Sequence, residues 1–592
     1  MCGIAGIMTT DGRAPEAALL DRLTELMRHR GPDGRGRHVK DDVGLVQTRL
    51  AIIDLETGDQ PLYEPGGAAL VCNGEIYNYI ELRQALDGVN WKTGSDCEPP
   101  LHLYRRHGLA FPERLRGMYA LAVHDPGERH LVLARDPFGI KPLYYVEAPG
   151  FFAFASEPQA LIRSGLMEPR LDPASRGELL QLQFTTGRDT PFAGIRRVLP
   201  GETLVVAGGR IVERRRRPNL PAAGPAGCTE AEALERLDRA LEDAVEVHQR
   251  SDVPYAMFLS GGIDSSALLA LMARLNERPV CAFTAGFSET QVPDERPQAR
   301  AVARACGAEH VEVEFGERDF WALAPQIAAA MDDPAADYAV LPSYKLAQEA
   351  SRGFKVILCG EGGDELFAGY GRYRRLMRPP QFGRRAPRRY GTFDRLPGAV
   401  LRDRLDGWRD GLTAAETGAA QGGLSRLQVA QAVDCADWLP NDLLTKLDRC
   451  LMAHGVEGRT PYLDPVVAEV AFRLPDRMKV RQRHGKWLLR RWLAEHRPEA
   501  KPFSRKKGFT VPVGEWLRRR GDTLGPLVAA QPGIAEMCRP DATARLFRSP
   551  DRHAGFAAWT LLFYALWHRH HILGLAAQGD VFETLAATPK DG

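Results

Sequence analysis

The segment Phe258–Ser266 constrains the fold more than any other part of this 592-residue chain. The apolar run Tyr255–Leu259 predicts a buried strand at its start, and the pattern over Ala267–Leu275 predicts a helix after it. Residues Ser260–Ser266 are therefore a turn from a strand into a helix, where free backbone N–H groups and the positive end of the helix dipole attract anions. The two glycines of the turn let the backbone approach such an anion closely. The sequence thus predicts a phosphate cradle.

The cradle differs from the usual ATPase loop because it lacks Gly-Lys-Ser/Thr and contains no lysine. It contains Asp264, and an acid beside phosphates is explained if it binds Mg²⁺. Three serines, Ser260, Ser265 and Ser266, add hydroxyl donors. An ordinary glycine-rich turn is the alternative. However, the complete Ser-Gly-Gly-Ile-Asp-Ser-Ser run resembles the pyrophosphate-binding loop of enzymes that split ATP into AMP and pyrophosphate.

Strand and helix patterns alternate along the second half of the chain, which predicts a parallel sheet wrapped by helices. Ligands on such sheets bind outside the carboxyl ends of the strands. The stretch Val356–Glu365 is another strand that runs into a glycine-rich, acidic turn. We therefore expect Asp364 to meet Asp264 across the site, where the two acids could share Mg²⁺, and Glu361 to face the same opening.

The first half begins with Cys2, directly after the initiator methionine. Removal of the methionine would leave a cysteine whose free α-amine, with a reference pKa of about 7.7–8.0, suits a general base for its own thiol. Taken alone, Cys2 is better explained as a chance cysteine in a first strand.

Four further stretches of the first half resemble the glutaminase domain of class II glutamine amidotransferases; they are Arg28–Asp33, Gln47–Asp54, Val71–Asn78 and Ser95–Glu98. In that family the arginine of the Arg-Leu segment holds the substrate α-carboxylate with its planar fork. The Asn-Gly pair supplies the oxyanion hole, and the following glutamate and the aspartate of Ser-Asp bind the substrate amine. Each residue alone has a structural explanation, and their joint order carries the resemblance. The implied glutamine site consists of Arg49, Leu50, Ala51, Ile52, Ile53, Asn73, Gly74, Glu75 and Asp96.

Three motifs of the second half look like glutamine-hydrolysing asparagine synthetase, and matching motifs run from Cys2 to about Pro512; the three lie at 360–370, 438–449 and 457–464. The resemblance implies that Glu361 supports an aspartyl-adenylate and that Tyr370 and Lys486 form the pair at the reacting centre. The catalytic set that it implies is Cys2, Asn73, Gly74, Glu361, Tyr370 and Lys486. It also implies that Leu259, Ala285, Cys359 and Gly360 make backbone contacts to the nucleotide. Together with the cradle residues Ser260, Gly261, Gly262, Asp264, Ser265 and Ser266 they form the predicted ATP site, and Asp264 and Asp364 form the predicted Mg²⁺ site.

We expect two domains. Residues 1–210 predict a glutaminase domain with the αββα sandwich of N-terminal nucleophile enzymes, because apolar strands such as Gly117–Val123 accompany helices such as Glu16–Arg28. Residues 211–227 predict a linker rich in arginine, proline and glycine. Residues 228–592 predict an α/β ATP-pyrophosphatase domain with a helical C-terminal part. For the arginine-rich stretch 371–390 a solvated loop is favoured over a basic lid, and the tail after Arg539 is assigned only to packing.

Composition excludes several partners. The formal net charge is only +2, which argues against nucleic acid, and no apolar run approaches a membrane span. The N-terminus lacks the basic-then-apolar signal pattern, and the ten cysteines form no Cys-x-x-Cys pair. A cytoplasmic protein fits best. Its oligomeric state is not determined by the sequence, and a homodimer is one option.

The expected substrates are glutamine, aspartate and ATP. Cys2 would release ammonia from glutamine, and the second domain would activate the aspartate β-carboxylate as an adenylate and convert it to asparagine. Three alternatives remain. The acceptor could be another carboxylate, on a specialised metabolite or a cell-surface sugar. The chain could be a tRNA-modifying ATP pyrophosphatase, or a regulator with degenerate sites, although the intact Cys2, Asn73, Asp264 and Asp364 argue against the last.

Overall fold

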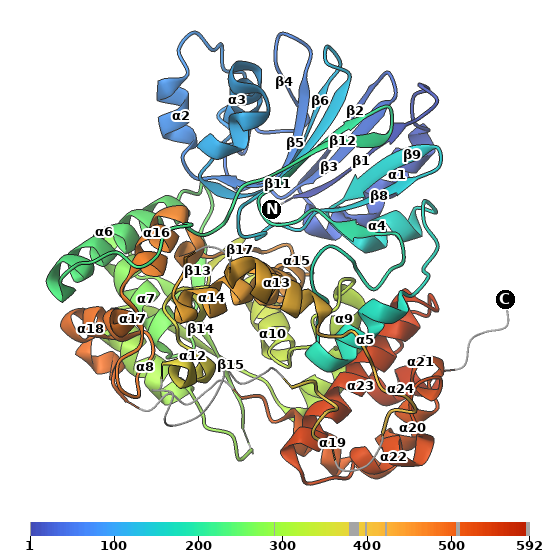
Figure 1. Ribbon diagram of the computed structural model, residues 1–592, viewed down its shortest axis with the longest axis vertical. Helices are drawn as coiled ribbons and strands as arrows, with labels where there is room; N and C mark the ends of the chain where they lie inside the picture. The colour runs from blue at the N-terminus through green and yellow to red at the C-terminus, as the bar shows by residue number, and fades with distance from the viewer. Residues whose placement is uncertain are drawn as a thin grey trace.

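The computed structural model of the chain describes residues 2–288, 290–377, 390–396, 400–420, 423–504 and 510–587. Its first half lies above the second in Figure 1, and the two share a long boundary. Within the described ranges no helix combines the length and the apolar character needed to cross a bilayer.

Two antiparallel sheets build the first half. In spatial order, the first contains β10 (Arg196–Arg197), β8 (Tyr144–Ala148), β9 (Phe151–Ala155), β1 (Gly3–Thr9), β3 (Val43–Arg49) and β2 (Gly34–Lys40). The second contains β12 (Arg210–Arg216), β11 (Glu202–Ala207), β7 (His130–Arg135), β6 (Gly117–Asp125), β5 (Ala69–Ile76) and β4 (Leu62–Tyr63).

The two sheets pack face to face, since residues of both, such as Ile4 and Val71, belong to one buried apolar cluster. Leu20 of α1 (Ala17–Leu26) is buried with the outer face of the first sheet, beside α4 (Pro158–Arg163). Leu101 of α3 (Pro99–His107) is buried with the outer face of the second sheet, beside α2 (Tyr79–Ala85). The predicted αββα sandwich is confirmed.

The segment expected to be a linker begins with a strand instead. β12 pairs with β11 from Glu202–Arg216 to Ala207–Arg210, so the second sheet extends to residue 216. The arginines of this edge strand are exposed, and Arg214 and Arg215 make ion pairs with Glu202 and Glu213. Charged side chains are a common feature of edge strands. Only residues 217–229 lack helix and strand, as a linker should.

A five-stranded parallel sheet forms the centre of the second half, as predicted. Its spatial order is β15 (Glu309–Glu314), β14 (Cys281–Gly286), β13 (Tyr255–Phe258), β16 (Val356–Leu358) and β17 (Glu457–Arg459). The chain builds outward from β13 in one direction and then returns to add β16 on the other side. In open α/β sheets such a switch point is where a crevice for ligands forms.

Helices flank the parallel sheet and extend beyond it (Figure 1). Those that alternate with its strands are α6 (Glu230–His248), α7 (Ile263–Leu275), α8 (Arg296–Ala305), α9 (Glu317–Ala330) and α10 (Val340–Ala350). The helices that follow β16 along the chain are α11 (Gly363–Leu366), α12 (Gly371–Leu376), α13 (Asp410–Ala420), α14 (Arg426–Val433), a π-helix (Asp434–Leu444), α15 (Thr445–Met452), α16 (Pro465–Arg473), α17 (Asp476–Lys479) and α18 (Trp487–His496).

The C-terminal helices pack against both halves of the chain; they are α19 (Val513–Arg519), α20 (Gly521–Ala529), α21 (Pro532–Ala535), α22 (Pro540–Leu546), α23 (Arg552–His571) and α24 (Val581–Ala586). Trp559 and Trp567 of α23 are buried and donate to backbone oxygens that follow α9. Figure 1 shows α23 beside α5 (Pro173–Leu182) from the first half. The tail therefore packs, as expected, and it also ties the two halves together.

Candidate active sites

Cys2 lies at the start of the central strand β1 and is almost fully buried. Its backbone N–H donates to Asn73 Oδ1 at 3.1 Å, and its carbonyl oxygen accepts from Arg30 Nε at 3.2 Å. Burial raises the pKa of the Cys2 thiol, and a hydrogen bond from the backbone of Leu50 opposes this shift. The backbone of the predicted nucleophile is thus held on both sides.

Asn73 and Gly74 lie on β5, next to Cys2. The Asn73 side chain is fully buried, and its Nδ2 donor has no hydrogen-bond partner among the described residues. Such an orphaned donor is costly unless a ligand accepts its hydrogen bond. A Cβ at Gly74 would lie 2.2 Å from the Met118 carbonyl oxygen, so only glycine fits there. This pair is suited to the predicted oxyanion hole.

The predicted carboxylate clamp, Arg49, ends β3 and is mostly buried. Its Nη1 donates to Asp59 Oδ1 at 2.9 Å, and its Nη2 contacts the backbone oxygens of residues 53 and 54. The loop Leu50–Ile53 follows and is anchored twice: Ala51 N donates to Asp33, and Ile52 O accepts from Asp252 N of the second half. In this state the arginine fork binds its own loop, so a substrate carboxylate would have to replace Asp59.

The two predicted amine-binding acids, Glu75 and Asp96, are both buried. Asp96 accepts from Ile76 N at 2.7 Å, and burial raises its pKa to about 6. Glu75 Oε2 lies 3.1 Å from Arg459 Nη2, which comes from β17 of the second half. Glu75 is therefore not an isolated acceptor in this state, because a synthetase-side cation already faces it.

The phosphate cradle opens into a cavity of about 1010 Å³ at the carboxyl ends of β13 and β16. Gly261 has φ +67°, a conformation that glycine adopts without strain. Nearly all of the predicted nucleotide residues line this cavity: Leu259, Ser260, Gly261, Gly262, Asp264, Ser265, Ala285, Cys359 and Gly360. Ser266 is the exception, since it is fully buried and does not line the cavity. The assignment of these residues to the nucleotide remains a prediction.

Asp264 and Asp364 come together as predicted, but Lys486 lies between them. Its Nζ contacts Asp264 Oδ2 and lies 2.7 Å from Asp364 Oδ1. Burial alone would lower the pKa of Lys486, but the two carboxylates outweigh burial and raise it, so the ammonium stays charged. Gly369 leaves room for this arrangement, because a Cβ there would lie 1.7 Å from Asp364 Oδ1 and 2.1 Å from Lys486 Cε.

The donor set can accommodate Mg²⁺ only together with other ligands. Among the described residues no three His, Cys, Asp or Glu side chains are grouped to hold a metal by themselves. Mg²⁺, however, usually takes one or two carboxylates, with substrate phosphates and water completing the octahedron. Two carboxylates on the rim of a phosphate cradle suit that pattern, provided that Lys486 yields part of its contact.

Two protein-family models match the chain, one over each half. Residues 1–216 match the glutamine amidotransferase domain family, and residues 236–569 match the asparagine synthase family. A putative glutamine-hydrolysing asparagine synthetase of Mycobacterium tuberculosis is 34% identical, covering 96% of this chain and 97% of the relative. The chain belongs to the glutamine-hydrolysing asparagine synthetase family. A glutamine-hydrolysing asparagine synthetase of Bacillus subtilis is 31% identical, covering 97% of each chain. Asparagine synthetase B of Escherichia coli is 28% identical, covering 90% of this chain and 85% of the relative.

Several residues around the synthetase cavity escaped the sequence analysis. Glu365 accepts a hydrogen bond from Tyr370 Oη at 2.6 Å, and burial followed by the Asp364 charge raises its pKa to about 7. Lys446 also lines the cavity. Burial raises the pKa of Glu361, and the positive charge of Lys446 opposes this shift. The cation that acts on Glu361 is thus Lys446. Glu365 adjoins the acidic turn and could have been singled out, but nothing local points to Lys446.

The arginine-rich stretch 371–390 lies largely outside the described residues. Of the described part, Arg372 is not simply solvated: it binds Asp434 at 2.7 Å, and its guanidinium lies 4.2 Å from the Tyr370 ring centroid. For this residue the expectation of a solvated loop is wrong.

Proposed function

We propose that this member of the asparagine synthetase family hydrolyses glutamine at Cys2 and uses ATP to convert aspartate to asparagine, releasing AMP and pyrophosphate. The proposed units are residues 1–210, extended by the rest of β12, and residues 228–592. The observation that carries the proposal is the joint presence, in one chain, of a buried cysteine beside the orphaned Asn73 donor and of a phosphate cradle with Lys486 at its rim.

In the glutaminase half, the α-amine exposed by loss of the methionine takes the proton of the Cys2 thiol. The thiolate attacks the glutamine side-chain amide, and the oxyanion is stabilised by Asn73 Nδ2 and the Gly74 backbone. Ammonia leaves, and water then cleaves the thioester to glutamate. Arg49 binds the substrate α-carboxylate, and Glu75 and Asp96 receive its ammonium group. On binding, the substrate would replace contacts that these residues make with Asp59 and Arg459.

In the synthetase half, an oxygen of the aspartate β-carboxylate attacks the α-phosphorus of ATP, and pyrophosphate leaves from the cradle at the start of α7. Ammonia then attacks the acyl carbon of the adenylate, and AMP departs. Lys486, Tyr370 and Glu361 surround the cavity in which both steps occur. A protonated Lys486 can balance the charge on the phosphates as they separate.

Mg²⁺ bound by Asp264 and Asp364 would neutralise the phosphate charge in this site. We also propose a cytoplasmic location, because the ten cysteines of the chain are all free thiols in the structure and a reducing compartment would maintain that state.

The test is a complete reaction with glutamine, aspartate, ATP and Mg²⁺, in which glutamate, asparagine, AMP and pyrophosphate are measured together. Equal amounts of asparagine, AMP and pyrophosphate are expected. A panel of other carboxylates replaces aspartate in parallel. AMP release with another acid but not with aspartate would reject the aspartate assignment and keep the amide-forming chemistry.

A further inference from the structure

Helix α15 lies between the two sites and contributes to both. Lys446 lines the synthetase cavity and donates to Asp337 Oδ2 at 3.0 Å. Asp448 is two residues further along the helix, and side chains two positions apart on an α-helix point about 200° apart. One turn of α15 therefore directs Lys446 toward the nucleotide cavity and Asp448 toward the glutaminase half.

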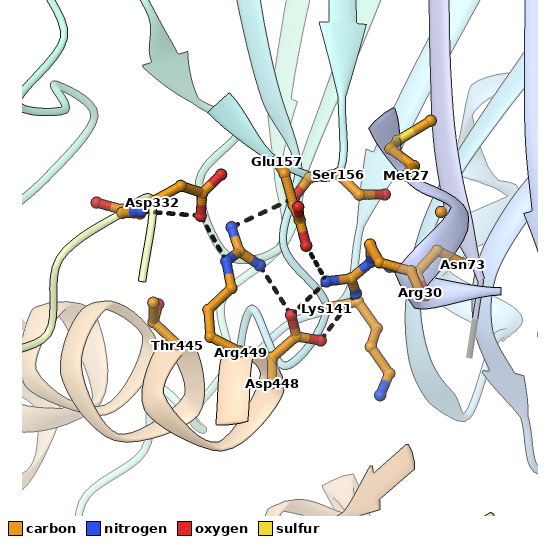
Figure 2. A network of polar contacts seen from close by, with 12 residues as sticks. Met27, Arg30, Asn73, Lys141, Ser156, Glu157, Asp332, Thr445, Asp448 and Arg449 are labelled. Carbon is orange, nitrogen blue, oxygen red and sulfur yellow. Dashed lines mark hydrogen bonds and ion pairs between the residues drawn. The ribbon is translucent and has the colours of Figure 1, made fainter. Parts of the chain in front are cut away.

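Asp448 binds Arg30 of the glutaminase half with both of its carboxylate oxygens. Arg30 Nη1 donates to Asp448 Oδ2 at 2.8 Å, and Nη2 donates to Oδ1 at 3.0 Å. Both side chains are almost completely buried. Such a two-point contact fixes the plane of the guanidinium as well as its position. Figure 2 shows the pair lying across the boundary between the halves.

The orientation that Asp448 imposes on Arg30 reaches the nucleophile directly. Arg30 Nε donates to the Cys2 carbonyl oxygen, as given above, while Nη1 also donates to Glu157 Oε1 at 2.8 Å. Because Asp448 and Glu157 set the plane of the guanidinium, the direction of its Nε–H is fixed as well. That direction is occupied by the backbone of the residue whose thiol must attack.

The far side of Asp448 is fixed as well. Arg449 Nη1 donates to Asp448 Oδ2 at 2.8 Å, and its Nε donates to Asp332 Oδ1 at 2.6 Å (Figure 2). The backbone oxygen of Asp332 in turn accepts a hydrogen bond from Trp567 Nε1 of α23. The carboxylate thus has little freedom to follow Arg30 if Cys2 moves, as a positioning group requires.

We propose that Asp448 of the synthetase half is a positioning residue for the glutaminase reaction, acting through Arg30 on the backbone of Cys2. The inference rests on the proposed role of Cys2. It extends that role by making the hydrolysis of glutamine depend on a helix that belongs to the other active site. Asp448 touches no substrate, and its effect appears in the rate of the attack rather than in the binding of glutamine.

The experiment compares Asp448→Asn, which keeps the shape and removes the charge, with Asp333→Asn. Asp333 provides a matched control because it also forms a buried, two-point contact across the boundary, with Arg197 at 2.6 and 2.8 Å, and does not contact Cys2. For each variant we measure the kcat and KM of glutaminase, the rate of Cys2 alkylation by iodoacetamide, asparagine synthesis from ammonium chloride, and the melting temperature.

We expect Asp448→Asn to lower the glutaminase kcat about tenfold or more with little change in KM, because a misplaced reacting group is costly at the chemical step. Alkylation of Cys2 should change in the same variant, and synthesis from ammonium should be largely retained. Asp333→Asn should keep the wild-type glutaminase kcat even if its melting temperature falls. If Asp448→Asn does not fold, Asp448→Glu keeps the buried charge, shifts the carboxylate, and should show the same kcat effect in a milder form.

An unchanged glutaminase kcat in the Asp448 variants, or an equal loss in the Asp333 control, would overturn the inference. Wild-type protein and Cys2→Ala distinguish this outcome from failure of the proposed function. If the wild-type protein hydrolyses glutamine and Cys2→Ala does not, the role of Cys2 stands whatever the Asp448 result.

Discussion

Gly369→Ala should impair the synthetase site while leaving the glutaminase site unchanged. The new Cβ would lie 1.7 Å from Asp364 Oδ1 and 2.1 Å from Lys486 Cε, whereas ordinary contacts need about 3.5 Å. The acid and the lysine must therefore each move by roughly 1.5 Å. Misplacement of about 1 Å can cost about a hundredfold in rate, so we expect at least that loss in asparagine synthesis from ammonium.

The assay follows AMP release with aspartate and ammonium chloride, with glutamine hydrolysis measured on the same preparation. Gly371→Ala is the matched control, because the nearest atom to its new Cβ is the flexible end of Arg374 at 3.4 Å. That variant should keep the wild-type rate. Normal AMP release by Gly369→Ala would refute the idea that Asp364 and Lys486 act at the positions that the structure shows.

Four further outcomes follow from the same geometry. Cys2→Ala should abolish synthesis from glutamine and preserve synthesis from ammonium salts; loss of both activities in a folded variant would contradict the separation of the sites. Asp264→Asn and Asp364→Asn should each abolish ATP–pyrophosphate exchange while glutaminase survives, and normal exchange in both would exclude the shared Mg²⁺ site. Glu361→Gln should keep the fold and lose aspartate-dependent AMP release about a hundredfold, as removal of a general acid or base does, whereas a residue that only caps its turn would leave the rate intact. The pKa of Glu365 is raised from 4.5 to about 7 in the folded state, so protonation of this acid contributes its full stabilisation below pH 4.5 and loses it as the pH rises through 7. Glu365→Gln should therefore reduce the dependence of the melting temperature on pH between 4.5 and 7. An unchanged dependence would show that another group titrates.

The cradle was predictable because its chemistry is local. Two glycines, an acid and three serines within seven residues restrict the backbone and the charge at once, and the neighbouring strand and helix patterns supply the geometry. Its partner turn at Gly360–Glu365 was predictable for the same reason. Lys486 lies more than a hundred residues beyond the second turn, so only the family resemblance placed it at the reacting centre. Its position between the two acids was not predicted.

The features that were not predictable from the sequence depend mostly on long-range contacts. β12 has no apolar alternation, since it is an exposed edge strand, so only its pairing with β11 distinguishes it from a linker. The contact of Glu75 with Arg459 was not predictable, because β17 lies far from β5 along the chain. The burial of Ser266 was not predictable either, because serines at helix starts resemble one another in sequence, whereas the pitch of α7 turns this one inward.

In the proposed glutamine site, two residues of the glutaminase half contact the segment 445–459 of the synthetase half. Asp448 orients Arg30, and Arg459 faces Glu75. Burial and the Glu457 carboxylate of β17 raise the pKa of Glu75, and although Arg459 of the same strand lowers it, the pKa stays well above its ordinary value. β17 therefore brings a cation and an acid to the proposed amine pocket at once. A glutaminase half separated from β17 would lose both of these charges as well as the contact between Asp448 and Arg30, so we expect glutamine hydrolysis to change when the halves are separated.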